Sequence, residues 1–146
     1  MNGDLPFGMP SRVPGGAWTL RVPEPAPRQY DEAKLQRAVH RYLGLALPHD
    51  AFHFAIPNGL MRSKKAAARA KGEGVKAGVC DLCVIYRGRA LFIELKTVTG
   101  RVSMAQRAMH KRLVHCGADV MLCRSVEEVE RALREATVPL SASVMA

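Results

Sequence analysis

The sequence predicts an α/β fold in which helices pack on a mixed β-sheet. Between residues 31 and 136 the apolar pattern changes repeatedly between helical spacing and strand-like alternation. Two capping-box sequences mark helix starts, and an Arg-Gly pair separates two apolar strand-like runs. The resulting order, α-β-β-β-α-β-α, is typical of a mixed sheet flanked by helices.

The first half of this region predicts one helix and one strand. Residues 31–46 carry an apolar stripe at helical spacing, and Asp31 is a suitable N-cap. Residues 52–56 alternate like a strand and end at a Pro-Asn-Gly turn sequence. Residues 60–78 are rich in Ala, Lys, Arg and Gly, a composition compatible with a short helical piece followed by a mobile loop.

The centre of the region predicts a β-hairpin. Two apolar runs, residues 81–86 and 89–96, flank the pair Arg87-Gly88. Two residues between strand-like runs, one of them glycine, favour a tight hairpin turn.

The last part predicts a helix, a strand and a second helix. Ser103 and Gln106 form a capping box for a helix over 103–116, which Gly117 ends. Residues 119–123 form a short strand, and a second capping box, Ser125 with Glu128, opens the final helix.

Composition and charge narrow the function classes. The chain has 146 residues, 22 Lys and Arg against 13 Asp and Glu, and a pI near 9.9. An apolar fraction of 48% excludes disorder throughout, and no apolar run approaches the ~20 residues of a membrane span. A small basic protein most often binds a polyanion, with nucleic acid first among them.

We divide the chain into three parts. Residues 1–30 are rich in Pro and Gly and predict a flexible arm, residues 31–136 predict the folded domain, and residues 137–146 predict a loose tail. The folded part holds 19 basic and 11 acidic residues, so the charge belongs to the domain. The N-terminus lacks the pattern of a secretion signal, so we expect a cytoplasmic protein without disulfides.

The four cysteines do not favour a structural zinc site. Cys80 and Cys83 have zinc half-site spacing, but six residues separate Cys116 from Cys123, and no histidine pattern completes the set. We expect buried, small apolar thiols instead.

The hairpin brings two carboxylates together. With Arg87 and Gly88 as the turn, Asp81 lies directly opposite Glu94, with Cβ atoms ~5 Å apart. Two carboxylates at that separation repel each other unless a cation lies between them, and oxygen ligands favour Mg²⁺ or Mn²⁺. Strand alternation places Lys96 on the same face as Glu94. A solvated edge of an amphipathic strand would explain Glu94 and Lys96 alone, but not the aspartate opposite them.

These residues resemble the PD-(D/E)XK nuclease superfamily and, within it, the virus-type replication-repair nuclease (VRR-NUC) family. The resemblance covers roughly residues 31–135. Its motifs are Glu32, Pro57-Asn58, the Gly-rich stretch into Gly78 and Asp81, Phe92-Ile93-Glu94-Leu95-Lys96, and Gln106. Cys80 replaces the proline that often precedes the aspartate, and His110 stands where related nucleases often have tyrosine. The resemblance implies a restriction-endonuclease-like αβββαβ core.

The resemblance also implies roles. Asp81, Glu94 and the backbone carbonyl of Leu95 would bind a metal, and Lys96 would orient or deprotonate the attacking water. Glu32 would complete the site, although a carboxylate near a helix start is also stabilised by the helix dipole. Gln106 would be an accessory residue, although capping alone explains it. The role of His110 stays open.

A basic stretch leads into Asp81. We expect DNA contacts from Arg62, Lys64, Lys65, Arg69, Lys71 and Lys76, with a solvated face as the alternative. A second basic surface is expected on the later helix, at Arg101, Arg107, Lys111 and Arg112.

The leading expectation is a Mg²⁺- or Mn²⁺-dependent DNA endonuclease that cleaves branched DNA such as Holliday junctions as a homodimer. The alternatives are a restriction-type or nicking nuclease on duplex DNA and a catalytically inert DNA-binding module on the same fold. A structural basic protein, such as a ribosomal component, would leave the paired carboxylates unexplained.

Overall fold

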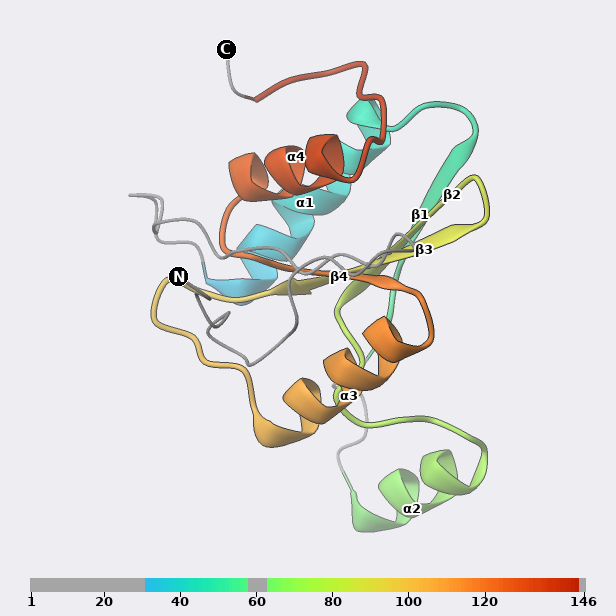
Figure 1. The fold of residues 1–146 in the computed structure, drawn as a ribbon. Coiled ribbons are helices and arrows are strands. Elements are labelled where there is room, and N and C mark those ends of the chain that lie inside the picture. Colours follow the sequence, from blue (N-terminus) through green and yellow to red (C-terminus); the bar gives the residue numbers. More distant parts are fainter. Residues whose placement is uncertain (1–30, 58–62, 145–146) are drawn as a thin grey trace, which may run out of the picture.

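The computed structural model describes residues 31–57 and 63–144, which form a mixed sheet with helices on both faces (Figure 1). The elements are α1 (Glu32–Ala46), β1 (Ala51–Ala55), α2 (Lys64–Gly72), β2 (Leu82–Tyr86), β3 (Arg89–Leu95), α3 (Met104–His115), β4 (Asp119–Cys123) and α4 (Val126–Glu135). This order confirms the predicted fold class and is consistent with a restriction-endonuclease-like core. The arm over 1–30, the turn residues Asn58 and Gly59, and Arg62 lie outside the described residues.

The sheet has the order β1-β2-β3-β4. The first two pairings are antiparallel, and β3 pairs with β4 in parallel through the crossover helix α3. At the hairpin turn Arg87 and Gly88 have φ angles of 46° and 75°, the left-handed conformation of a two-residue hairpin turn. Leu82 pairs with Ile93, so the register is the one the sequence predicts.

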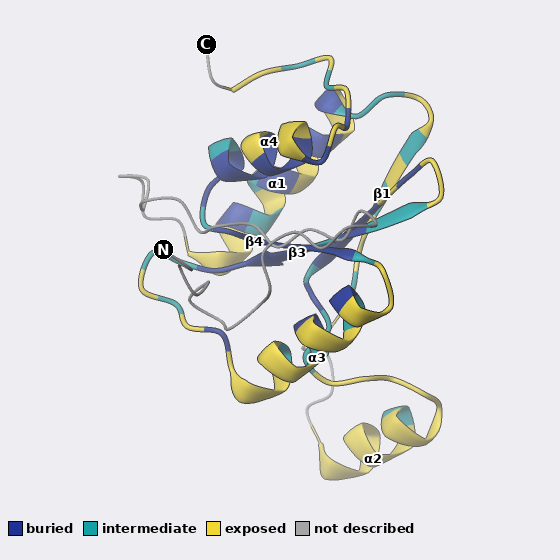
Figure 2. Ribbon diagram, viewed as in Figure 1, coloured by how far each residue is buried: buried dark blue, intermediate teal, exposed yellow. Residues whose placement is uncertain are grey.

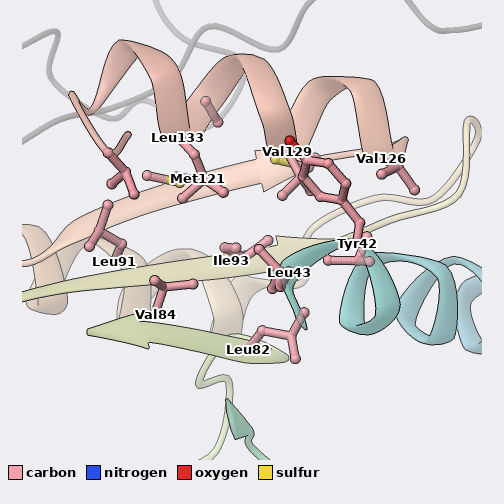
Figure 3. Close-up of a cluster of buried hydrophobic side chains, with 14 of the residues drawn as sticks. Tyr42, Leu43, Leu82, Val84, Leu91, Ile93, Met121, Val126, Val129 and Leu133 are labelled. Carbon is pink, nitrogen blue, oxygen red and sulfur yellow. The ribbon is translucent and has the colours of Figure 1, made fainter. Parts of the chain in front are cut away.

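The main core lies between the sheet and the helices α1 and α4. Leu82, Val84, Leu91 and Ile93 face these helices, and Figure 3 shows Leu43, Val129 and Leu133 directed at the same layer. A smaller cluster of Cys80, Val114 and Val120 lies on the opposite face, under α3. The two faces of β3 therefore separate the main core from the side on which Glu94 lies.

The N-termini of the helices follow the capping rules. Asp31 accepts a hydrogen bond from Lys34 N, and Ser103 with Gln106 forms a complete capping box. The box predicted at α4 is only half formed. Ser125 accepts from Glu128 N, but the Glu128 carboxylate accepts from Arg124 N, one residue before the cap.

Two peripheral segments differ in how firmly they pack. Helix α2 has no buried residue and extends beyond α3 (Figure 2). The C-terminal segment, which the sequence predicts to be loose, is held on the helical layer over its described part. Val138 is 2% exposed, Ser141 N donates to Ala46 O, and Val144 N donates to the buried Glu130 carboxylate.

No helix within residues 31–57 and 63–144 combines the length and apolar character needed to cross a bilayer.

Candidate functional site

Glu94 is a fully buried carboxylate near the end of β3. Strand alternation turns it away from Ile93 and Leu95, which lie in the main core, and toward α3. Its Oε1 accepts a hydrogen bond from Gln106 Nε2 at 2.5 Å and lies 3.1 Å from Lys96 Nζ. The sequence predicts Gln106 as a cap, and the structure shows that it also contacts this carboxylate.

Asp81 lies just before β2, across the hairpin from Glu94. Its Oδ2 accepts a hydrogen bond of 2.8 Å from Leu95 N, and its backbone oxygen accepts one from Ile56 N. Burial and then the charge of Glu94 raise the pKa of Asp81 to about 6, and the bond from Leu95 only partly offsets them. Two acids therefore share a site that disfavours having both ionised.

Lys96 is the cation of this group. Its side chain is 11% exposed, and its Nζ lies 3.1 Å from Glu94 Oε1 and 3.4 Å from Glu32 Oε1. Burial lowers the pKa of Lys96, but the hydrogen bond to Glu94 and the charges of Glu94 and Glu32 outweigh it, so the net direction is upward.

Glu32 joins the site from the first turn of α1. The sequence predicts an inward position, and the side chain is half-exposed while still reaching Lys96. The structure thus brings together Glu32, Asp81, Glu94, Lys96 and Gln106. Leu95 lies between Glu94 and Lys96 in the chain, and its backbone N–H donates to Asp81.

Comparison with protein families identifies the family to which a domain with this site belongs. A family model described as the VRR-NUC domain matches residues 29–127, which include every site residue named above. The chain belongs to the VRR-NUC family. It is accordingly a nuclease domain of the PD-(D/E)XK type. Searches of curated proteins and of solved structures found no significant match.

Gly78 allows the segment that precedes Asp81 to pack closely against α3 in this VRR-NUC domain. Gly78 has a φ of 78°, and a Cβ on it would lie 2.6 Å from Ala105 O and 2.8 Å from Gln106 N. Only glycine allows this approach, which places the chain leading to Asp81 beside the helix turn that carries Gln106.

Arg124 holds the loop that follows Lys96. Its guanidinium donates to the backbone oxygens of Thr97, Val98 and Gly100, the last at 2.9 Å. Sequence reasoning missed this residue, because nothing in the pattern distinguishes it from other surface arginines. Arg124 directly follows β4, and the parallel pairing of β4 with β3 is what brings it beside the end of β3.

Two buried side chains lie behind Glu94. His110 is 1% exposed on α3, and its Nε2 lies 3.5 Å from Glu94 Oε2. Ligand atoms of Cys80, Glu94 and His110 all lie within 4.8 Å of one another. The structure thus brings Cys80 toward His110 rather than into a zinc half-site with Cys83. Cys80, Cys83 and Cys123 are buried as predicted, whereas Cys116, in the C-cap of α3, is exposed, so the prediction was wrong there.

The described basic residues of the stretch that leads into Asp81 are exposed, unlike the largely buried residues of this site. They are Lys64, Lys65, Arg69, Lys71 and Lys76. Arg69 pairs with Glu73 at 2.8 Å, whereas the others on α2 form a charged surface with no buried anchor. The predicted basic positions Arg101, Arg107, Lys111 and Arg112, in and just before α3, are also exposed.

A surface hollow of about 400 Å³ lies beside α1. It is lined by Ala33, Gln36, Arg37, His40, Ala55 and Leu82. Among the described residues neither Glu32 nor Asp81 lines this hollow, although they are the chain neighbours of Ala33 and Leu82.

Proposed function

We propose that this VRR-NUC domain is a Mg²⁺-dependent DNA endonuclease that acts on branched DNA, such as Holliday junctions, as a homodimer. The observation that carries the catalytic part is the grouping of Asp81, Glu94 and Lys96 where β2 begins and β3 ends. Asp81 accepts a hydrogen bond from Leu95 N, and Lys96 Nζ lies 3.1 Å from Glu94 Oε1. The finer parts, branched substrate and dimer, rest on the family resemblance.

The donor set fits a divalent metal. Asp81 and Glu94 are oxygen donors, and the Glu94 Oε2 atom is buried without a hydrogen-bond partner among the described residues. Burial, and after it the charge of Glu94, raises the pKa of Asp81, and a bound cation would favour the ionised carboxylate against both causes. Asp81, Glu94 and the Leu95 carbonyl would hold the ion, with Glu32 completing the site.

A bound Mg²⁺ or Mn²⁺ would lower the pKa of a water and neutralise charge on the transferring phosphoryl group. Lys96 would orient that water and offset phosphate charge. The two glutamates beside it keep Lys96 protonated, which supports the electrostatic role over that of a base. Gln106 and Arg124 would hold Glu94 and the loop after Lys96 in place.

The DNA would contact the exposed basic residues of α2 and the segment after it. Lys64, Lys65, Lys71 and Lys76 suit phosphate contacts, which position a duplex without reading its sequence. Arg62 is included in this proposal from the sequence alone. The formal charge of +9 supports a polyanionic partner.

One assay tests the proposal. Labelled linear, flap and four-way junction DNA would be incubated with the protein in Mg²⁺, Mn²⁺ or EDTA. We expect metal-dependent cleavage, strongest on the junction, and its loss in Asp81→Ala and Lys96→Ala. Asp50→Asn is the matched control, because Asp50 forms an exposed ion pair with Arg87 at the hairpin turn, the end of the hairpin opposite to Asp81.

Four outcomes would contradict parts of the proposal. Cleavage that survives both substitutions, or persists in EDTA, removes the metal site. Equal cleavage of linear and branched DNA favours the restriction-type or nicking alternative. Binding without cleavage in every metal favours the inert module, and a monomer in sedimentation removes the dimer.

A further inference from the structure

The buried group Cys80, Glu94 and His110 has a chemistry unlike the rest of the site. Glu32, Asp81 and the Leu95 carbonyl are oxygen donors, the class that Mg²⁺ prefers. A thiol and an imidazole are softer donors that select zinc and related ions. Glu94 is shared, because its Oε1 faces Lys96 while its Oε2 faces His110.

The three side chains are close enough to share one ion. Their ligand atoms lie within 4.8 Å of one another, and the residues are 0%, 0% and 1% exposed. Donors around a tetrahedral zinc lie about 2.0–2.3 Å from the metal, so modest side-chain rotations would bring these atoms into range.

Glu94 and His110 also have unused bonding capacity. Glu94 Oε2 and both ring nitrogens of His110 are buried without a hydrogen-bond partner in the described part of the chain. The 3.5 Å contact between them brings opposite charges together only if the imidazole is protonated. Buried polar atoms of this kind are uncommon and call for an explanation, and an ion is one.

We propose that Cys80, Glu94 and His110 form a second, thiophilic cation site that binds Zn²⁺ and inhibits the nuclease. On binding, the Cys80 thiol loses its proton to solvent and the thiolate coordinates the ion, together with a His110 nitrogen and Glu94 Oε2. This engages Glu94 Oε2, the same carboxylate oxygen that is open to the Mg²⁺ site, and so removes a ligand from that site. The inhibition rests on the proposed function, whereas the zinc site does not.

Cobalt provides a direct readout of the site without DNA. Co²⁺ titrated into the reduced full-length chain should give a sulfur-to-cobalt charge-transfer band with one ion per chain, and Zn²⁺ should remove the band. Cys80→Ser should abolish it. Cys116→Ser is the matched control, because Cys116 is the exposed cysteine and the one most open to unspecific binding.

His110→Asn provides a second variant if Cys80→Ser fails to fold. It keeps the thiol but loses the imidazole, so the band should need at least about tenfold more Co²⁺. Circular dichroism establishes that each variant is folded. A band that persists in Cys80→Ser, or that is lost in Cys116→Ser, overturns the site.

Activity then tests the inhibition. In saturating Mg²⁺, Zn²⁺ should inhibit the wild type and Cys116→Ser alike, and His110→Asn should need at least about tenfold more Zn²⁺ relative to its own uninhibited rate. Equal inhibition of His110→Asn would place Zn²⁺ at the Mg²⁺ ligands and overturn the proposal. A cobalt band without DNA cleavage in any metal would leave the zinc site standing and remove the nuclease function.

Discussion

Asp81 Oδ2 accepts a 2.8 Å hydrogen bond from the backbone N–H of Leu95, the residue between Glu94 and Lys96. This bond ties the segment before β2 to the end of β3. It also holds Asp81 near the buried Glu94, whose charge is one cause of its raised pKa. The site is therefore organised for chemistry at some cost in stability.

Asp81→Asn should abolish cleavage and stabilise the metal-free protein at high pH. The pKa of Asp81 is raised from 3.8 to about 6, so the folded chain binds this proton more tightly than the unfolded chain. That contribution to stability is present below pH 3.8 and is lost as the pH rises through about 6. We expect the substitution to raise the free energy of unfolding by about 1–2 kcal/mol at pH 8 in EDTA, after allowance for screening, and to change it little at pH 3.5.

Urea denaturation at the two pH values measures this effect, with Asp50→Asn as the exposed control. Equal effects of Asp81→Asn at both pH values would contradict the assigned cause.

Lys96→Met should reduce cleavage by at least about 100-fold and destabilise the metal-free protein by about 3 kcal/mol, because it leaves Glu94 buried without its cation. Mg²⁺ should restore part of that stability, since it would replace the missing charge. Thermal unfolding with EDTA and with Mg²⁺ measures the difference, and the exposed Lys111→Met is the control. A loss that Mg²⁺ leaves unchanged would argue against a metal beside Glu94.

Gly78→Ala should destabilise the fold more than Gly74→Ala. Both glycines have positive φ angles, 78° and 95°, so both substitutions cost about 1 kcal/mol of backbone strain. Only at Gly78 would the new Cβ meet backbone atoms, those of Ala105 and Gln106, which adds about 1–3 kcal/mol. Denaturant midpoints separate the two terms, and equal losses would show that the close approach to α3 is not maintained.

Arg124→Lys should loosen the loop after Lys96. An ammonium cannot reproduce the planar fork that contacts three backbone oxygens, those of Thr97, Val98 and Gly100. Hydrogen exchange should rise at the Gly100 amide, which donates to Thr97 O, and cleavage should fall by about tenfold. Arg131→Lys, at an exposed position on α4, should change neither the exchange rate nor the cleavage rate. If the Gly100 amide stays protected from exchange in Arg124→Lys, Arg124 does not hold this loop.

Neutralising α2 should weaken DNA binding uniformly across sequences. The triple variant Lys64→Gln, Lys65→Gln and Lys71→Gln removes three exposed cations from a helix that buries nothing. If each contacts a phosphate, the slope of log K against log salt should fall by up to about 2.7. Fluorescence anisotropy in EDTA at several salt concentrations measures the slope, with Arg131→Gln as the control. An unchanged slope would show that α2 is a solvated face without DNA contacts.

Much of the fold follows from local sequence. Helix caps, the Arg87-Gly88 turn and the change of apolar period each involve a few adjacent residues, so the element order and the hairpin register were predictable. Since a two-residue turn fixes which residues face each other, the placement of Asp81 opposite Glu94 was predictable too.

The tertiary structure decided what surrounds those residues. Arg124 reaches the loop after Lys96 only because β4 lies parallel to β3, and Cys80 reaches His110 only because α3 crosses that face of the sheet. The C-terminal segment is held by Glu130, a buried carboxylate that no sequence pattern links to it. Periodicity and caps describe interactions between neighbours in the chain, whereas these contacts join residues 14 or more positions apart, and only the packing of helices on the sheet brings them together.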